Sequence, residues 1–215
     1  MVRERKGRKP LGKALKKKVF IYCEGETEKF YFDMLSAKYS SYTIEAKSLK
    51  RVGIKTKVVG SKGPQDIVSE AIRTLEKDSM KNEVHKAYVV FDNDLSSKDE
   101  ILKAIEKAEK HSLEVLYSNI NFDLWILLHF EKVNSYCSKK EINRKLSTYY
   151  GVESYANEVK GEMVSKILRD KIRFAVDNAT TLLGDTKGSL IKSIDNNPFI
   201  NIHSHLEDIF QTSKL

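Results

Sequence analysis

Acidic residues stand at the ends of two apolar runs, where they are well placed to do chemistry. Glu24 directly follows the run 19–23, and Asp92 and Asp94 follow the run 87–91. Ligand sites of parallel α/β sheets lie outside the carboxyl ends of the strands, so these carboxylates are expected to converge on one edge. Carboxylates in that arrangement repel one another, and a hard divalent cation relieves the repulsion. The pattern predicts a Mg²⁺ or Mn²⁺ site that activates water and stabilises charge at phosphorus.

The same acids also have a purely structural explanation. The segment 92–94 is typical of a turn or a helix cap, and Glu26 and Glu28 are acids that the start of a helix favours. Against this explanation, the segment 97–100 already has the sequence of a capping box for the next helix. Glu24 precedes a glycine and lies before the expected helix. The metal-site interpretation is therefore preferred.

The hydrophobic pattern predicts strands that alternate with helices over the first 131 residues. Expected strands lie at 19–23, 42–49, 87–91 and 113–117, and expected helices at 27–38, from 64, from 97 and at 122–130. A loop rich in Gly and Lys is expected at 53–63, and Asn121 is the expected cap of the apolar helix after it. This alternation predicts an α/β fold with a parallel sheet flanked by helices.

The remaining third of the chain has the pattern of a helical region. Apolar residues follow helical spacing from 164 to 183 for about five turns, and a turn at 196–198 precedes a last helix. The predicted organisation is a basic flexible tail at 1–18, an α/β domain at 19–131, and a helical C-terminal region at 132–215 packed on or beside it.

The net charge of +8 is concentrated in the tail. The remainder of the chain has equal numbers of acidic and basic residues. A basic arm of this kind suits a polyanion such as DNA or RNA, although a solubilising terminus is the plainer alternative. A separate candidate phosphate contact is Lys62, in a Gly-rich loop before a helix, without the spacing of an ATP-binding loop. The basic residues of the tail are Arg3, Arg5, Lys6, Arg8, Lys9, Lys13, Lys16, Lys17 and Lys18.

Composition argues against several classes of protein. The two cysteines, Cys23 and Cys137, are too few for a disulfide framework or a four-ligand zinc site. No apolar run approaches the roughly 20 residues of a membrane span, and no secretory signal is recognisable. His203 and His205 lack further ligands at metal-binding spacing, and His129 on an apolar helix is more typical of a core histidine. A cytoplasmic protein without a membrane partner is expected.

Several stretches of the chain together resemble the RloB-like family, which is named for restriction-modification loci and has a Toprim-like domain. Toprim domains occur in topoisomerases, bacterial primases, small ribonucleases and overcoming-lysogenization-defect nucleases. The resemblance covers nearly the whole chain, and the order and spacing of its motifs are fairly specific. In chain order these motifs are YCEGETE at 22–28, FDND at 91–94, SN at 118–119, FDLWILLHFE at 122–131, and Asn197-Pro198 ahead of His203.

The resemblance implies a Toprim-like fold and assigns roles to the acids. Glu24 would be a general acid/base or a metal ligand, and Asp92 and Asp94 would be metal ligands. Asp123 stands where the family often has Glu, and it is either a ligand of a second metal or a favourable acid at a helix start. Ile120 stands where Pro is common.

The function expected is that of a Mg-dependent nuclease of a restriction or phage-defence system, acting on DNA or RNA. The chain is too short for a topoisomerase and lacks the zinc module of a primase. The alternative is a non-catalytic nucleic-acid-binding or regulatory subunit of such a system, and other subunits are its expected partners. A phosphotransfer receiver is disfavoured, because proteins of that class have an acidic pair after the first strand. A haloacid-dehalogenase-like phosphatase would have its Asp-x-Asp there.

Overall fold

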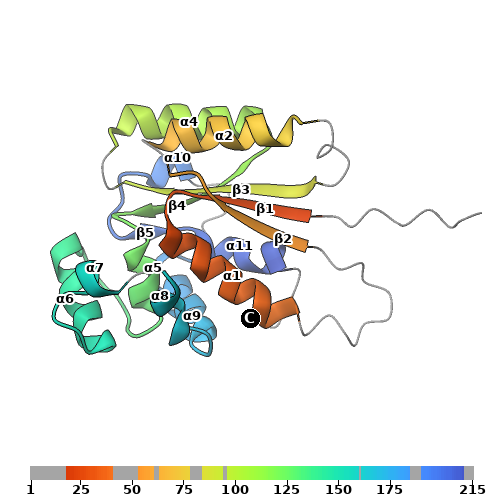
Figure 1. Cartoon of the computed structure of the whole chain (residues 1–215). Coiled ribbons are helices and arrows are strands. Elements are labelled where there is room, and N and C mark those ends of the chain that lie inside the picture. Colours follow the sequence, from red (N-terminus) through yellow and green to blue (C-terminus); the bar gives the residue numbers. More distant parts are fainter. Residues whose placement is uncertain are drawn as a thin grey trace, which may run out of the picture.

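A five-stranded sheet runs through the middle of the protein (Figure 1). The computed structural model describes residues 18–40, 53–60, 63–77, 84–93, 96–159, 161–184 and 190–210. The strands lie in the order β2-β1-β3-β4-β5, and only β5 is antiparallel to its neighbour. Their bounds are Lys18–Cys23 (β1), Gly53–Val58 (β2), Val84–Asp92 (β3), Glu114–Asn119 (β4) and Phe199–Ile200 (β5). The predicted α/β fold is confirmed.

Helices cover both faces of the sheet (Figure 1). Two lie on one face, α2 (Pro64–Leu75) and α4 (Lys98–Lys110). On the other side are α1 (Glu26–Ser40), α5 (Asp123–Leu128), α6 (Lys139–Tyr150), α7 (Tyr155–Glu158), α8 (Glu162–Lys166), α9 (Ile172–Leu183) and α11 (Ile202–Phe210), while the short α10 (Leu190–Ser193) lies towards α2 and α4. None of the described helices is long and apolar enough to cross a membrane.

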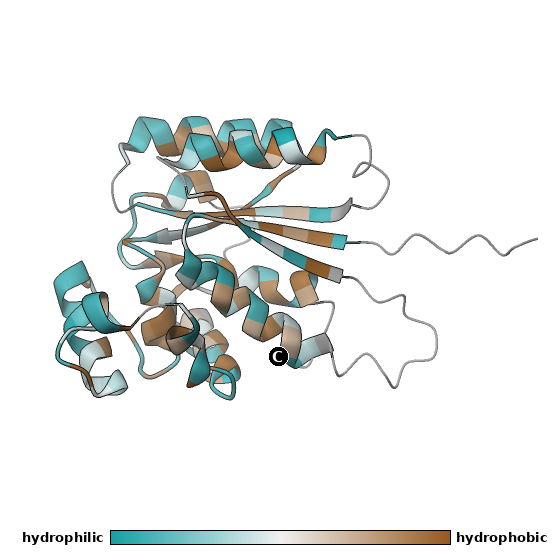
Figure 2. Cartoon of the chain, viewed as in Figure 1, coloured by the Kyte–Doolittle hydropathy of each residue, from teal (hydrophilic) through white to brown (hydrophobic). Residues whose placement is uncertain are grey.

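Alternation along β1 builds the two core layers. Val19, Ile21 and Cys23 join the layer that contains α1 and α5, whereas Phe20 and Tyr22 join the layer under α2 and α4. Successive side chains of a strand point to opposite faces, so a strand that is buried on both faces is apolar throughout. Figure 2 shows the matching pattern on α2 and α4, whose hydrophobic positions face the sheet.

The helical region packs directly on the α/β part of the chain. Helix α5 begins with Asp123, and its other five residues, Leu124–Leu128, are all apolar and fully buried. Side chains from α6, α7, α8, α9 and α11 belong to the same core layer as those of α1 and α5. The helix predicted at 122–130 is therefore the buried link between the two parts.

The edge strand β2 lies within 53–63, where the sequence predicts a loop, and that prediction is wrong for 53–58. The strand expected at 42–49 lies outside the described residues. In β2 the half-buried Ile54 and Thr56 alternate with the exposed Lys55 and Lys57. Lysines on an edge strand discourage pairing with other chains, but they also give the segment the composition of a loop.

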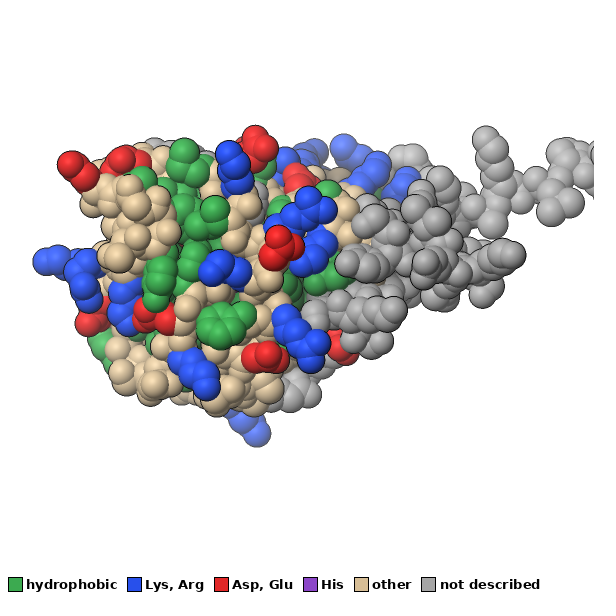
Figure 3. Space-filling view, turned by 90° about the horizontal axis from the view of Figure 1, so that it is seen from below, with side chains coloured by type: hydrophobic (Ala, Val, Ile, Leu, Met, Phe, Trp, Pro, Cys, Tyr) green, Lys and Arg blue, Asp and Glu red, His purple; other side chains and the backbone are tan. Residues whose placement is uncertain are grey.

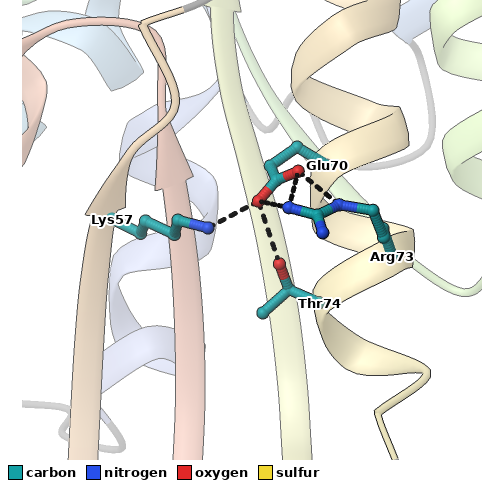
Figure 4. A network of polar contacts seen from close by, with 4 residues as sticks. All are labelled: Lys57, Glu70, Arg73 and Thr74. Carbon is teal, nitrogen blue, oxygen red and sulfur yellow. Dashed lines mark hydrogen bonds and ion pairs between the residues drawn. The ribbon is translucent and has the colours of Figure 1, made fainter.

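An ion-pair network ties this edge strand to α2 (Figure 4). Glu70 accepts from Lys57 Nζ at 2.6 Å and from both Arg73 Nε and Nη2 at 2.8 Å. Thr74 Oγ1 donates to the same carboxylate at 3.3 Å. These hydrogen bonds from Lys57 and Arg73 lower the pKa of Glu70 to about 2. The network holds β2 at the edge of the sheet, on the side of β1 away from β3.

Three further expectations need correction. The five-turn helix expected at 164–183 is two helices, α8 and α9, separated by a turn at 167–170. The N-cap of α5 is Phe122, and no side chain caps that helix. Lys18, which was assigned to the tail, is the first residue of β1 and is half-buried there. By contrast, the capping boxes at Ser97 and Ser138 are confirmed.

Candidate functional site

The acids after β1 and β3 lie at the same edge of the sheet. The two strands are parallel neighbours, with Cys23 opposite Val90. Glu24 is the first residue beyond β1, and Asp92 is the last residue of β3. The expected pairing of these strands is confirmed, and it places both residues at the carboxyl edge. This is where ligands of parallel α/β sheets bind.

The expected metal-ligand set is only partly within the described residues. Asp94 lies outside them, as do Lys62 and the bases of the tail from Arg3 to Lys17. Among the described residues, no three His, Cys, Asp or Glu side chains are grouped as a metal ion would require. The set of Glu24, Asp92 and Asp94 therefore stays a prediction.

An open pocket of about 360 Å³ lies beside Asp92. Its walls come from the start of α1, the end of β3, the start of α5 and the helical region. Four acidic side chains line it together with one basic side chain, Lys139, so its described lining is strongly acidic. The lining residues are Glu26, Thr27, Glu28, Asp92, Asn121, Phe122, Asp123, Lys139, Asn143, Tyr155, Ala156, Val159 and Gly161.

Glu28 is an acid of the pocket wall whose surroundings alter its pKa. Burial raises its pKa to about 7, and the charges of Glu24 and Asp123 act in the same direction. Its Oε2 accepts a hydrogen bond from the backbone N of Gly25 at 3.1 Å. A Cβ at position 25 would come within 3.1 Å of that oxygen, so glycine there makes room for the carboxylate. A pKa near neutrality is typical of groups that transfer protons.

In the sequence alone, Glu28 has the position of an ordinary acid at a helix start. The signal that distinguishes it is its spacing, because it lies four residues after Glu24 and within the first turn of α1. That spacing turns its side chain back towards the loop after β1. The burial that raises its pKa comes from residues far along the chain, and the spacing alone does not reveal it.

Asp123 is held by hydrogen bonds at both oxygens. Tyr155 Oη donates to Oδ1 at 3.0 Å, and Asn121 Nδ2 donates to Oδ2 at 3.1 Å. Asp92 is anchored to the same helix, since the backbone N of Phe122 donates to its Oδ2 at 3.4 Å. The start of α5 thus connects both aspartates, and α7 contributes Tyr155 from the helical region. These contacts give Asp123 a fixed orientation in the pocket wall.

His129, His203 and His205 belong to the core and not to the pocket. His129 is fully buried, its Nδ1 lies 2.9 Å from the carbonyl of Trp125, and its Nε2 lies 3.1 Å from Tyr31 Oη. Burial lowers its pKa to about 4, so the ring is neutral with Nδ1 donating to the carbonyl. His203 Nε2 lies 2.8 Å from the carbonyl of Gly184, and His205 packs edge-on against Tyr88. The preference for a core histidine at 129 is confirmed.

Fold and pocket define an α/β protein with an acidic pocket at the carboxyl edge of a mostly parallel sheet. Residues 19–209 match the family model described as RloB-like protein. Because the match spans most of the chain, the protein belongs to the RloB-like family. No match was found among curated proteins or among solved structures.

Proposed function

We propose that this protein is a divalent-cation-dependent phosphodiesterase that cleaves nucleic acid, with a Toprim-type acidic site at the carboxyl edge of its sheet. The observation that carries the proposal is the pocket itself. Acids from the start of α1, from β3 and from α5 gather there, and one of them has a pKa near 7. Clustered acids with a perturbed pKa are characteristic of sites that handle protons and charge.

The side chains of the pocket fit a hard cation. Its acidic donors are carboxylates, and no imidazole or thiolate is among the described residues that line it. Mg²⁺ and Mn²⁺ prefer such oxygen donors and retain water and phosphate ligands, for which an open pocket leaves room. Glu24, Asp92 and Asp94 would hold the ion, which when bound would activate water and stabilise charge on the phosphate.

The residues of the pocket also supply a route for protons. With a pKa of about 7, Glu28 is roughly half protonated at neutral pH. It can therefore accept a proton from an attacking water or return one to a leaving oxygen. Tyr155 and Asn121 keep Asp123 from rotating, so the negative wall opposite α1 has a fixed shape. Hydrolysis of a phosphodiester requires both functions, because the phosphate is anionic and protons must be transferred from the attacking water and to the leaving oxygen.

The cellular role proposed is that of a nuclease in a restriction or phage-defence system, in keeping with the loci for which the family is named. Other subunits of such a system are the expected protein partners. A non-catalytic subunit that only binds nucleic acid is the alternative, and it differs from the nuclease in one measurable property, strand cleavage.

The test is a cleavage assay with labelled single-stranded and duplex DNA and RNA, in Mg²⁺, in Mn²⁺ and in EDTA. Cleavage is expected with either ion and not in EDTA. Asp92→Asn and Glu24→Gln are each expected to reduce the rate by about 10²-fold or more, the range for loss of a group that acts in the chemical step. The matched control is Asp99→Asn, the same change at an exposed residue of α4. Binding without cleavage in every condition would replace the nuclease with the alternative.

A further inference from the structure

One segment of the helical region has a local excess of positive charge. Residues 132–150 contain five Lys or Arg and a single acid, Glu141, although the chain beyond residue 18 is neutral as a whole. One of these bases, Lys145, is paired with Glu131. The three bases nearest the start of α6 are Lys139, Lys140 and Arg144, and all three are exposed.

The first of these bases, Lys139, adjoins the acidic pocket. Lys139 and Asn143 line the pocket from one strip of the helix. Lys140 follows Lys139, and Arg144 follows Asn143, so these two bases lie on the neighbouring strip of the helix. They are one turn, or about 6 Å, from each other. Neither Lys140 nor Arg144 forms an ion pair with another described residue. A short basic strip therefore leads along α6 to the mouth of the pocket.

The strip is carried by a rigidly anchored helix. Ile142 and Leu146 bury the opposite side of α6 in the core, and the capping box of Ser138 and Glu141 fixes its first turn. Figure 2 shows that the rest of α6 is largely hydrophilic. The bases are thus held in place relative to Asp92, and they do not depend on the position of the tail.

Two of the bases on α4 differ from these in being paired with acids. On α4, at the opposite face of the sheet, Lys103 is paired with Asp99 at 2.6 Å and Lys98 with Asp195. On the face shown in Figure 3, basic and acidic side chains are interspersed around a hydrophobic centre. Met163 on α8 and Phe174 on α9 are among the exposed large hydrophobic side chains of the described residues.

We infer that α6 is the surface that binds a single strand of nucleic acid and leads it into the pocket, with Lys140 and Arg144 contacting phosphates beside the one in the pocket. The inference rests on the proposed function, because it takes the pocket as the place where the strand is cut. A basic surface that follows the backbone is the usual means of holding single strands. A pocket of about 360 Å³ accepts a group the size of a nucleotide, whereas a duplex must first be opened to reach it.

The test measures binding in EDTA, so that it does not depend on cleavage. The full chain and its variant Lys140→Ala/Arg144→Ala are titrated with a labelled single strand across a salt series. Loss of two phosphate contacts should reduce the magnitude of the log–log salt slope by about 1.4, which is about 25-fold in affinity at 0.1 M salt when the slopes meet at 1 M. The matched control, Lys103→Ala/Lys110→Ala on α4, removes the same charge and should leave the slope unchanged.

The outcomes separate this inference from the proposed function. An unchanged slope for the α6 variant, or an equal loss for the α4 variant, would overturn the inference even if the protein cleaves nucleic acid. An equal loss on duplex DNA of the same length would overturn the preference for a single strand. If the α6 variant alone loses affinity and no strand is cut in Mg²⁺ or Mn²⁺, the binding surface stands and the nuclease proposal fails. DNA and RNA single strands are both titrated to identify the substrate.

Discussion

Burial shifts the pKa values of two ionisable side chains, the half-buried Glu28 and the fully buried His129, in opposite directions. Burial disfavours the charged form, which raises the pKa of an acid and lowers that of a base. The pKa of Glu28 is about 7 and that of His129 about 4, compared with ordinary values of 4.5 and 6.5. Glu28 faces the pocket and can be used for chemistry, whereas His129 is enclosed by Tyr31 and Trp125.

The raised pKa of Glu28 predicts a pH-dependent cost in stability. Between about pH 4.5 and 7 the folded protein holds this proton more tightly than the unfolded chain, so this residue's contribution to stability is lost as pH rises through that window. Glu28→Gln removes the titration. The free energy of unfolding of the variant, relative to that of the wild type, should therefore rise by on the order of 2 kcal/mol from pH 5 to pH 8. This figure is reduced from the full shift because Glu28 is partly exposed to solvent. Urea denaturation in EDTA at both pH values measures this.

A suitable control for this prediction is Glu109→Gln, because Glu109 is exposed on α4. The control should show the same stability difference from the wild type at both pH values. A difference between wild type and Glu28→Gln that does not change with pH would contradict the raised pKa. His129 acts in the opposite sense, losing stability as pH falls from 6.5 towards 4, and it is present in all the proteins compared.

At this scale the sequence could predict where acids fall but not how they are buried. Glu24 and Asp92 follow apolar runs, so their position at the ends of strands was predictable. The environment of Glu28 depends on Asp123, which is 95 residues further along the chain, and on a pocket wall that includes Tyr155. Such contacts depend on tertiary packing and leave no periodic signal in the local sequence.

At the scale of elements, two identical capping boxes provide a matched pair. Ser97 caps α4 and Ser138 caps α6, each accepting from the backbone N of the Glu three residues on. Ser→Ala at either position should reduce stability by about 1 kcal/mol. Only Ser138→Ala loosens the turn that holds Lys139 beside the pocket, so only that variant should also weaken binding of a single strand.

Thermal denaturation and oligonucleotide titration of the two serine variants test this pair. Equal binding by both variants would show that the first turn of α6 does not contribute to the site. A loss of binding in Ser97→Ala as well would show that the effect is not specific to the first turn of α6.

The elements that the sequence predicted well are those with strong periodicity or clear boundary residues. Helix α2 begins at Pro64 as expected, and α4 and α6 follow their capping serines. The strands β2 and β5 were missed for different reasons. Alternating lysines on the solvent side disguised β2, while β5 has two residues and exists only because it pairs with β4.

At the scale of the whole molecule, the tail joins the fold far from the pocket. Lys18 lies at the amino end of β1, and the acidic pocket lies at the carboxyl edge of the sheet. The strand β1 spans about 20 Å, whereas 17 residues can extend up to about 60 Å. The predicted electrostatic arm could therefore contact a strand that is bound at α6, or nucleic acid further away.

Deleting residues 2–17 should remove most of the salt dependence that the tail contributes. About five phosphate contacts correspond to a slope of about −4. Affinity should weaken for all sequences alike, because phosphate contacts position a protein without reading bases. Binding across a salt series, for the full-length and truncated proteins, measures the effect. Equal slopes would leave the tail as a solubilising segment, and the strip on α6 would still be tested separately.

The most direct test of the acidic site is the location of a bound ion. Crystals of the full chain grown with Mn²⁺, measured near the manganese absorption edge, would show the ion as an anomalous peak. The predicted result is a peak between the carboxylates of Glu24 and Asp92 at the carboxyl edge of the sheet, absent from Asp92→Asn crystals prepared in the same way. A Mn²⁺ ion bound only elsewhere, or no peak at this edge at saturating Mn²⁺, would contradict the proposal that these acids form a metal-dependent catalytic site.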